Sequence, residues 1–189
     1  MGLMKGNRSL FIVVGVVAVL IAGWWFFWRG GSSNAVSLID RFEAAEKKPQ
    51  ESPSLFALED VTINGETKRA ITIKPTAGTR IKFKIHVPDD GWLRVSVALK
   101  PEAWTQEGDG IRFMALVSDG RASDELFIQD INPFLNQNDR RWVPVMVDLS
   151  AYAGEDVEIM LNTYGSTPGK PGDVRNDLAV WGSPEIVIR

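Results

Sequence analysis

Residues Leu10 to Trp28 form an uninterrupted apolar run, LFIVVGVVAVLIAGWWFFW, without a charge, an amide or a hydroxyl. At about 1.5 Å of rise per residue, a helix of this length matches the roughly 30 Å hydrocarbon core of a lipid bilayer. The run therefore predicts one transmembrane helix over residues 10–28. Residues 1–9 precede it as a short tail, and we expect the rest of the chain on the other side of the membrane.

The basic residues around the run predict its orientation. Lys5, Arg8 and the amino terminus precede it, and Arg29 is the only charge close behind it. The positive-inside bias places the tail in the cytoplasm and Gly30 onward outside. A cleaved signal peptide is the alternative, with Ser33-Asn34-Ala35 as a small-x-small cleavage site. The run exceeds the roughly 7–15 residues of a signal peptide's apolar region, so we expect a retained signal anchor.

Two features of the run bear on what packs against it. A seam of small residues at helical spacing lets another helix approach closely. A block of aromatic residues at the outer end is typical of an interfacial belt, although its rings can also pack on other membrane-protein subunits or on a hydrophobic cofactor. The seam is Gly15, Ala18 and Ala22, and the block is Trp24, Trp25, Phe26, Phe27 and Trp28.

Charge and cysteine content restrict the part outside the membrane. The 189-residue chain has a formal net charge of −3 and no cysteine. Lys5, Arg8 and Arg29 are the only charges before Gly30, so the remainder carries −6. We expect no nucleic-acid partner, because phosphate binding needs clustered lysine and arginine. Without disulfides the exterior part must be held by its core alone, and its length suits one domain.

Residues 29–54 predict a tether that contains a short helix. Gly30 to Asn34 is a flexible spacer, and Pro49 to Pro53 is a linker. Between them, Val36 to about Lys47 predicts an amphipathic helix that ends at Pro49. The apolar face of this helix is formed by Leu38, Ile39, Phe42 and Ala45.

From residue 55 to the C-terminus the hydrophobic period changes to two. In the stretch Arg80 to Val87, for example, apolar and polar residues alternate strictly, which is typical of a strand buried on one face. Asn64-Gly65 separates two such runs and is a preferred two-residue hairpin turn. Eight or nine short strands and no helical period predict an all-β fold, an antiparallel β-sandwich of the jelly-roll kind, over residues 55–189.

Catalytic patterns are missing from the sequence. His86 is the single histidine and lies among lysines on the predicted solvent face of its strand. There is no cysteine nucleophile, no nucleophile elbow, and no His- or Cys-rich metal spacing. Paired carboxylates for sugar hydrolysis depend on a three-dimensional separation. We therefore expect no enzyme activity, and a hydrolase is the least favoured of three hypotheses.

Oxygen-bearing side chains on two loops are candidate ligands for a structural Ca²⁺ ion, because this cation selects hard oxygen ligands. Aspartate and asparagine also occupy turns for backbone reasons, which is the alternative. The candidates are Glu107, Asp109, Asn176 and Asp177.

Trp104 is the tryptophan most suited to contact a glycan, because it lies in a polar loop where its ring could stack on a sugar. Packing over the end of the sandwich is the alternative for this residue. Trp92, Trp142 and Trp181 lie in or beside predicted strands, and we expect them in or near the core.

The C-terminal third carries two recognisable segments, VDLSAYAG over Val147 to Gly154 and NDLAVWGSPEI over Asn176 to Ile186. These segments resemble the galactose-binding-domain-like β-sandwiches, including modules related to the NPCBM carbohydrate-binding group, which occur on many bacterial extracytoplasmic and membrane proteins. The resemblance covers roughly residues 55–189. It implies the sandwich fold and a domain outside the cytoplasmic membrane of a bacterium, on its periplasmic or extracellular side.

The matched residues are scaffold, so the resemblance implies a ligand only by analogy. Asp148 can bond nearby backbone amides, Leu149 can fill the core, and Gly154 permits a left-handed turn. Two functional hypotheses rank above a hydrolase. In the first, the sandwich is a non-enzymatic accessory subunit or interaction module of a larger membrane complex. The alternative is a membrane-tethered carbohydrate-binding module.

Overall fold

The computed structural model describes residues 35–76, 78–165 and 178–189. Within these ranges the chain forms eleven strands and four single-turn 3₁₀ helices. The strands are β1 (Val36–Ser37), β2 (Glu46–Lys48), β3 (Phe56–Ile63), β4 (Glu66–Ile73), β5 (Arg80–His86), β6 (Gly91–Leu99), β7 (Ile111–Ser118), β8 (Ser123–Ile131), β9 (Val143–Asp148), β10 (Asp156–Gly165) and β11 (Ala179–Ile188). The 3₁₀ helices are η1 (Pro53–Leu55), η2 (Pro101–Ala103), η3 (Gln137–Asp139) and η4 (Ser150–Tyr152).

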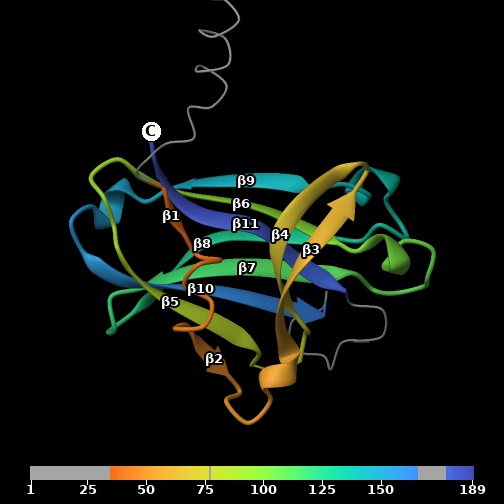
Figure 1. Cartoon of the computed structure of the whole chain (residues 1–189), viewed down its shortest axis with the longest axis horizontal. Coiled ribbons are helices and arrows are strands. Elements are labelled where there is room, and N and C mark those ends of the chain that lie inside the picture. The colour runs from red at the N-terminus through yellow and green to blue at the C-terminus, as the bar shows by residue number, and fades with distance from the viewer. Residues whose placement is uncertain (1–34, 77, 166–177) are drawn as a thin grey trace, which may run out of the picture. The chain divides into compact units, whose positions relative to one another are not determined.

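The strands form two antiparallel sheets, which confirms the predicted β-sandwich (Figure 1). The first sheet has the order β3-β4-β11-β6-β9, with β1 paired to β11. The second sheet has the order β2-β5-β10-β7-β8. The chain crosses between the sheets at most connections from β4 onward, so neighbours in a sheet are seldom neighbours in sequence.

The core lies between the two sheets and takes every second residue of the central strands. Trp181 of β11 is at its centre, with the ring of Phe113 edge-on at 5.3 Å and the ring of Phe127 tilted at 5.8 Å between centroids. The largest fully buried side chains are Trp181, Phe83, Phe113, Leu38, Ile63, Ile71, Ile73, Ile81, Leu93, Ile111, Ile131 and Leu149.

The turns follow the sequence signals closely. Asn64 and Gly65 both have positive φ, at 51° and 81°, as the predicted hairpin turn requires. The Asp148 carboxylate accepts the backbone N–H of Ser150 at 2.8 Å. Leu149 is fully buried, and Gly154 has a φ of 76°, in the left-handed region where glycine is favoured. The predicted roles of these three scaffold residues are confirmed.

The prediction of an amphipathic helix over Val36 to Lys47 is wrong. The segment runs as strand, tight turns and strand, with i to i+3 hydrogen bonds such as Phe42 N–H to Ile39 O at 3.1 Å. Leu38 and Phe42 are both buried in the sandwich core. The apolar residues recur at helical spacing because these two side chains enter the same core from consecutive tight turns. β1 pairs with β11 and β2 pairs with β5, so one compact unit extends from Ala35 to the C-terminus.

The predicted transmembrane helix over residues 10–28, with its seam and aromatic block, lies outside the described residues. Among the residues that are described, no helix combines the length and apolar character needed to cross a bilayer.

Candidate ligand-binding site

The outer face of the second sheet is built from the residues that alternate with the core. Ile159 and Leu161 of β10 point into the core, so the intervening Met160 and its neighbours of the same parity point outward. The same alternation turns Met114 and Leu116 of β7 outward between core residues. We call this surface, formed by β5, β10, β7 and β8, the outer face.

An apolar band runs across the middle of the outer face. Met160 lies opposite Leu116, and Met114 lies opposite Ile128 in the registers of β10, β7 and β8. Met160 is 7% exposed and Ile128 is 40% exposed, so the solvent exposure of the band increases from β10 towards the edge strand β8. Methionine side chains are flexible and polarizable, so such a band can adapt to a ligand.

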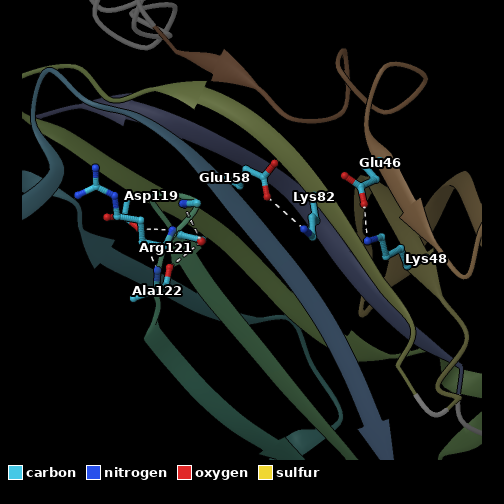
Figure 2. A network of polar contacts seen from close by, with 9 residues as sticks. Glu46, Lys48, Lys82, Asp119, Arg121, Ala122 and Glu158 are labelled. Atoms are coloured by element: carbon cyan, nitrogen blue, oxygen red, sulfur yellow. Dashed lines mark hydrogen bonds and ion pairs between the residues drawn. The ribbon is translucent and has the colours of Figure 1, made fainter.

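Ion pairs border the band at both ends. On one side, Arg112 donates two hydrogen bonds of 2.7 Å each to the two carboxylate oxygens of Asp130. These bonds lower the pKa of Asp130 and raise that of Arg112. On the other side, Lys82 of β5 and Glu158 of β10 form a pair at 3.1 Å (Figure 2). Both pairs present charged hydrogen-bonding groups next to apolar surface.

Asn162 and Tyr164 of β10 form a polar pair on the outer face. The Asn162 Nδ2 donates to the Tyr164 hydroxyl at 3.0 Å. Asn162 is 4% exposed, and among the residues that the structure describes no donor reaches its Oδ1. A buried amide oxygen without a partner is costly and is commonly satisfied by water or a ligand hydroxyl.

A groove opens at the β5 edge of the same sheet. β2 pairs with Arg80 to Lys82 of β5, and beyond this pairing Arg41, in the turn before β2, donates to the backbone carbonyl of Lys84 at 2.9 Å. The groove has a volume of about 640 Å³, within the usual range of ligand sites. Its lining residues are Arg41, Ala44, Ala45, Glu46, Gln50, Lys82, Phe83, Lys84 and Glu158.

The outer face and the groove meet at Lys82 and Glu158, which belong to both surfaces. Together they offer an apolar band, several charged donors and acceptors, and one unsatisfied amide oxygen. This combination suits a ligand that has both C–H surface and hydroxyl groups.

The tryptophans lie elsewhere. Trp104 is half-buried, and its Nε1 donates to the Leu99 carbonyl at 3.0 Å. It packs against a second apolar cluster, which includes Trp142 at 6% exposure. Trp181 is fully buried, whereas Trp92 is half-buried under the guanidinium of Arg189 at 5.1 Å. Ligand contact by Trp104 remains a prediction.

The predicted calcium ligands are only partly described. Glu107 is exposed and Asp109 is half-buried, with its Oδ1 buried and unpaired among the described residues. Asn176 and Asp177 lie outside the described residues. Within the described ranges, no group of three acidic or histidine side chains is placed to hold a metal ion. The calcium site remains a prediction.

Sequence reasoning missed the outer-face residues Met114, Met160, Asn162 and Tyr164. Met114 occupies an outward position in a strictly alternating strand, where a polar residue is expected, and this was the available signal. β10 carries apolar residues on both faces, so its period does not reveal which of them point outward.

Known proteins of similar sequence give little functional information. No family model matches the chain. An uncharacterized protein of Archaeoglobus fulgidus is 39% identical over 104 residues, which cover 54% of this chain and 25% of that protein. The match therefore spans about a quarter of the length of that relative.

Solved structures of similar fold include carbohydrate-binding modules. Tandem CBM51 modules of a family 98 glycoside hydrolase from Streptococcus pneumoniae align with a TM-score of 0.50 and 13% identity, over 84% of this chain and 48% of theirs. The CBM22-2 xylan-binding domain from Paenibacillus barcinonensis aligns with a TM-score of 0.48 and 6% identity, over 82% of this chain and 98% of that domain. The first of these matches shows that the described residues have the β-sandwich fold found in carbohydrate-binding modules.

Proposed function

We propose that this chain is a membrane-tethered carbohydrate-binding module whose ligand lies across the outer face of the second sheet. The supporting observation is the apolar band of Met114, Leu116, Ile128 and Met160 between two bordering ion pairs. A sugar ring has apolar C–H faces and a rim of hydroxyl groups, so it can contact such a band while bonding to the charged groups. The shared fold of carbohydrate-binding modules supports the same reading.

Binding can be tested with the full chain in detergent micelles, by calorimetry with xylohexaose, N-acetylglucosamine oligomers and galactan oligosaccharides. Ile128→Ser removes apolar surface at the open edge of the band, and we expect it to weaken binding severalfold. Met146→Ser is the matched control, because Met146 is 42% exposed against 40% for Ile128 and lies on β9 of the first sheet. Equal weakening by both variants, or no binding to any probe, would contradict the proposal.

The tether in this proposal is the apolar run over residues 10–28. We expect the chain to remain in the membrane pellet after extraction at alkaline pH, with the domain accessible to protease from outside the cytoplasm. Release of the chain into the supernatant would contradict a membrane anchor and favour a cleaved signal peptide.

A second candidate function is the accessory subunit of a membrane complex, and one observation favours it. Phe134 and Leu135 are 40% and 77% exposed on a loop that is held by several hydrogen bonds. Asn132 accepts the backbone N–H of Leu135 at 3.1 Å, and Arg140 donates to the Pro133 carbonyl at 2.9 Å. Mild solubilisation, native gel separation and mass spectrometry test this candidate, which predicts co-migration with defined membrane proteins.

A structural Ca²⁺ at Glu107 and Asp109, with Asn176 and Asp177, is part of the proposal. The buried Asp109 Oδ1, which has no partner among the described residues, supports it. Added Ca²⁺ should raise the melting temperature of the chelator-treated protein, and Asp109→Asn should remove most of that rise. An unchanged melting temperature would contradict the site.

A further inference from the structure

The groove at the β5 edge carries more positive than negative side chains. Arg41, Lys82 and Lys84 line it, against Glu46 and Glu158. Lys48 binds Glu46 at 2.9 Å and Lys82 binds Glu158 at 3.1 Å, so both carboxylates are already paired (Figure 2). The remaining positive charge belongs to Arg41 and Lys84.

Arg41 and Lys84 are exposed, and no described carboxylate forms an ion pair with either of them. Their positions are linked, because Arg41 Nη1 donates to the backbone carbonyl of Lys84 at 2.9 Å. That bond holds the guanidinium at the mouth of the groove and leaves its other N–H groups free to donate. A guanidinium fixed in this way matches the two oxygens of a carboxylate.

The walls of the groove suit a sugar ring beside such a carboxylate. Ala44 and Ala45 provide apolar surface, and Gln50 adds an amide at the rim. Lys82 and Glu158 connect this surface to the apolar band of the outer face. A single oligosaccharide can therefore extend from the band into the groove.

We propose that the groove is a subsite for an acidic sugar, with the carboxylate of a uronic acid residue bound between Arg41 and Lys84. This inference rests on the proposed carbohydrate-binding function and names the class of its ligand. It adds a charged contact, and hence a charge preference, to a surface whose band alone would accept neutral sugars.

The test compares two probes that share one skeleton. The trisaccharide of galacturonic acid carries carboxylates, and its methyl ester presents the same rings without the charge. Calorimetry with the full chain in detergent should show tighter binding of the acid than of the ester. Added salt should weaken binding of the acid and leave the ester nearly unchanged.

Lys84→Gln removes one of the two cations from an exposed strand position, so the variant should fold as the parent chain does. We expect it to weaken binding of the acid about fivefold, as for loss of one partly exposed ion pair, and to leave the ester unchanged. Lys74→Gln is the matched control, since Lys74 is also exposed but lies outside the groove. Arg41→Lys keeps the charge and removes the bidentate geometry, so it should also weaken binding of the acid.

The outcomes separate this inference from the function on which it rests. Equal affinities for acid and ester, or equal effects of Lys84→Gln and Lys74→Gln, overturn the acidic subsite. If neutral oligosaccharides still bind and Ile128→Ser weakens them, the carbohydrate-binding function stands without the subsite. If neither the acid, the ester nor any neutral oligosaccharide binds, both proposals are refuted.

Discussion

Gly182 of β11 lies directly beneath the ring of Trp142, and an alanine there should destabilise the domain. A Cβ at this position would lie 2.7 Å from Cζ3 and 3.0 Å from Cη2 of Trp142, and 2.9 Å from Cδ of Lys68. The lysine stem can move aside. The indole cannot move freely, because it is 6% exposed and its Nε1 donates to the Glu66 carbonyl at 3.1 Å.

Overpacking of this kind typically costs about 1–3 kcal/mol, and we expect Gly182→Ala to lower the free energy of unfolding by that amount. Trp142→Phe removes the two ring atoms that cause the clash. By itself it should cost on the order of 2 kcal/mol, from lost apolar contact and an unpaired carbonyl. In the double variant, the cost of Gly182→Ala should largely disappear.

Urea unfolding followed by far-ultraviolet circular dichroism measures all four free energies in one cycle. A coupling energy of about 1–3 kcal/mol between the two positions is expected, because they are in direct contact. If Gly182→Ala costs less than about 0.5 kcal/mol and the two changes are additive, Trp142 does not cover Gly182. Glycan binding should be the same in all variants that fold, because Gly182 belongs to the first sheet and Trp142 packs on it, whereas the proposed ligand lies on the second sheet.

Three further changes test the scaffold. Leu149→Ala should lower the free energy of unfolding by about 2–5 kcal/mol, because Leu149 is fully buried, and a loss below about half of one kcal/mol would place it at the surface. Gly110→Ala should be strongly destabilising in the same assay, because Gly110 has a φ of 83° and its Cβ would lie 2.7 Å from the Ile131 carbonyl oxygen; a neutral result would contradict this backbone geometry. The hydrogen bonds from Arg112 hold the pKa of Asp130 below its ordinary value of 3.8, so their contribution to stability is present above about pH 4 and is lost as the pH falls through the folded-state pKa. Asp130→Asn should reduce this acid dependence by less than about 1 kcal/mol, because the carboxylate is 53% exposed, and an unchanged pH profile of stability would show that the pair contributes nothing.

The strands that alternate strictly could be predicted from the sequence, and so could the turns between them. Ile81 and Phe83 face the core as expected, and Asn64-Gly65 makes the expected hairpin. The period-two pattern and the turn residues are local signals, and the strands and turns form where these signals predict them. The order of strands in each sheet was not predictable in this way, because β5 meets β10 and β6 meets β11 across long stretches of chain.

The segment before residue 55 shows why a local pattern can mislead. Leu38, Ile39, Phe42 and Ala45 recur at helical spacing, and Leu38 and Phe42 are indeed buried. The pairing of β1 with β11 and of β2 with β5 fixes the two ends of this segment as strands, and those contacts are long-range. Tertiary contacts therefore overrode a correct hydrophobic pattern.

The candidate site was harder to predict than the fold, since it depends on which side chains of different strands become neighbours. Met160 and Leu116 are far apart in the chain and opposite each other in the sheet. Arg41 reaches Lys84 only because the turn before β2 folds against β5. The sequence search for ligand residues looked at loops and tryptophans, whereas the structure brings together residues in the middle of strands.

The pairing of β1 with β11 brings the two ends of the compact unit next to each other. Val36 lies opposite Ile186, so the first described residues and the last ones are neighbours about 5 Å apart, the spacing of adjacent strands (Figure 1). A unit whose ends meet can be circularly permuted by a short linker, or inserted into a surface loop of another protein without forcing that loop apart. The same sandwich can thus be carried at an end of a longer chain or within it.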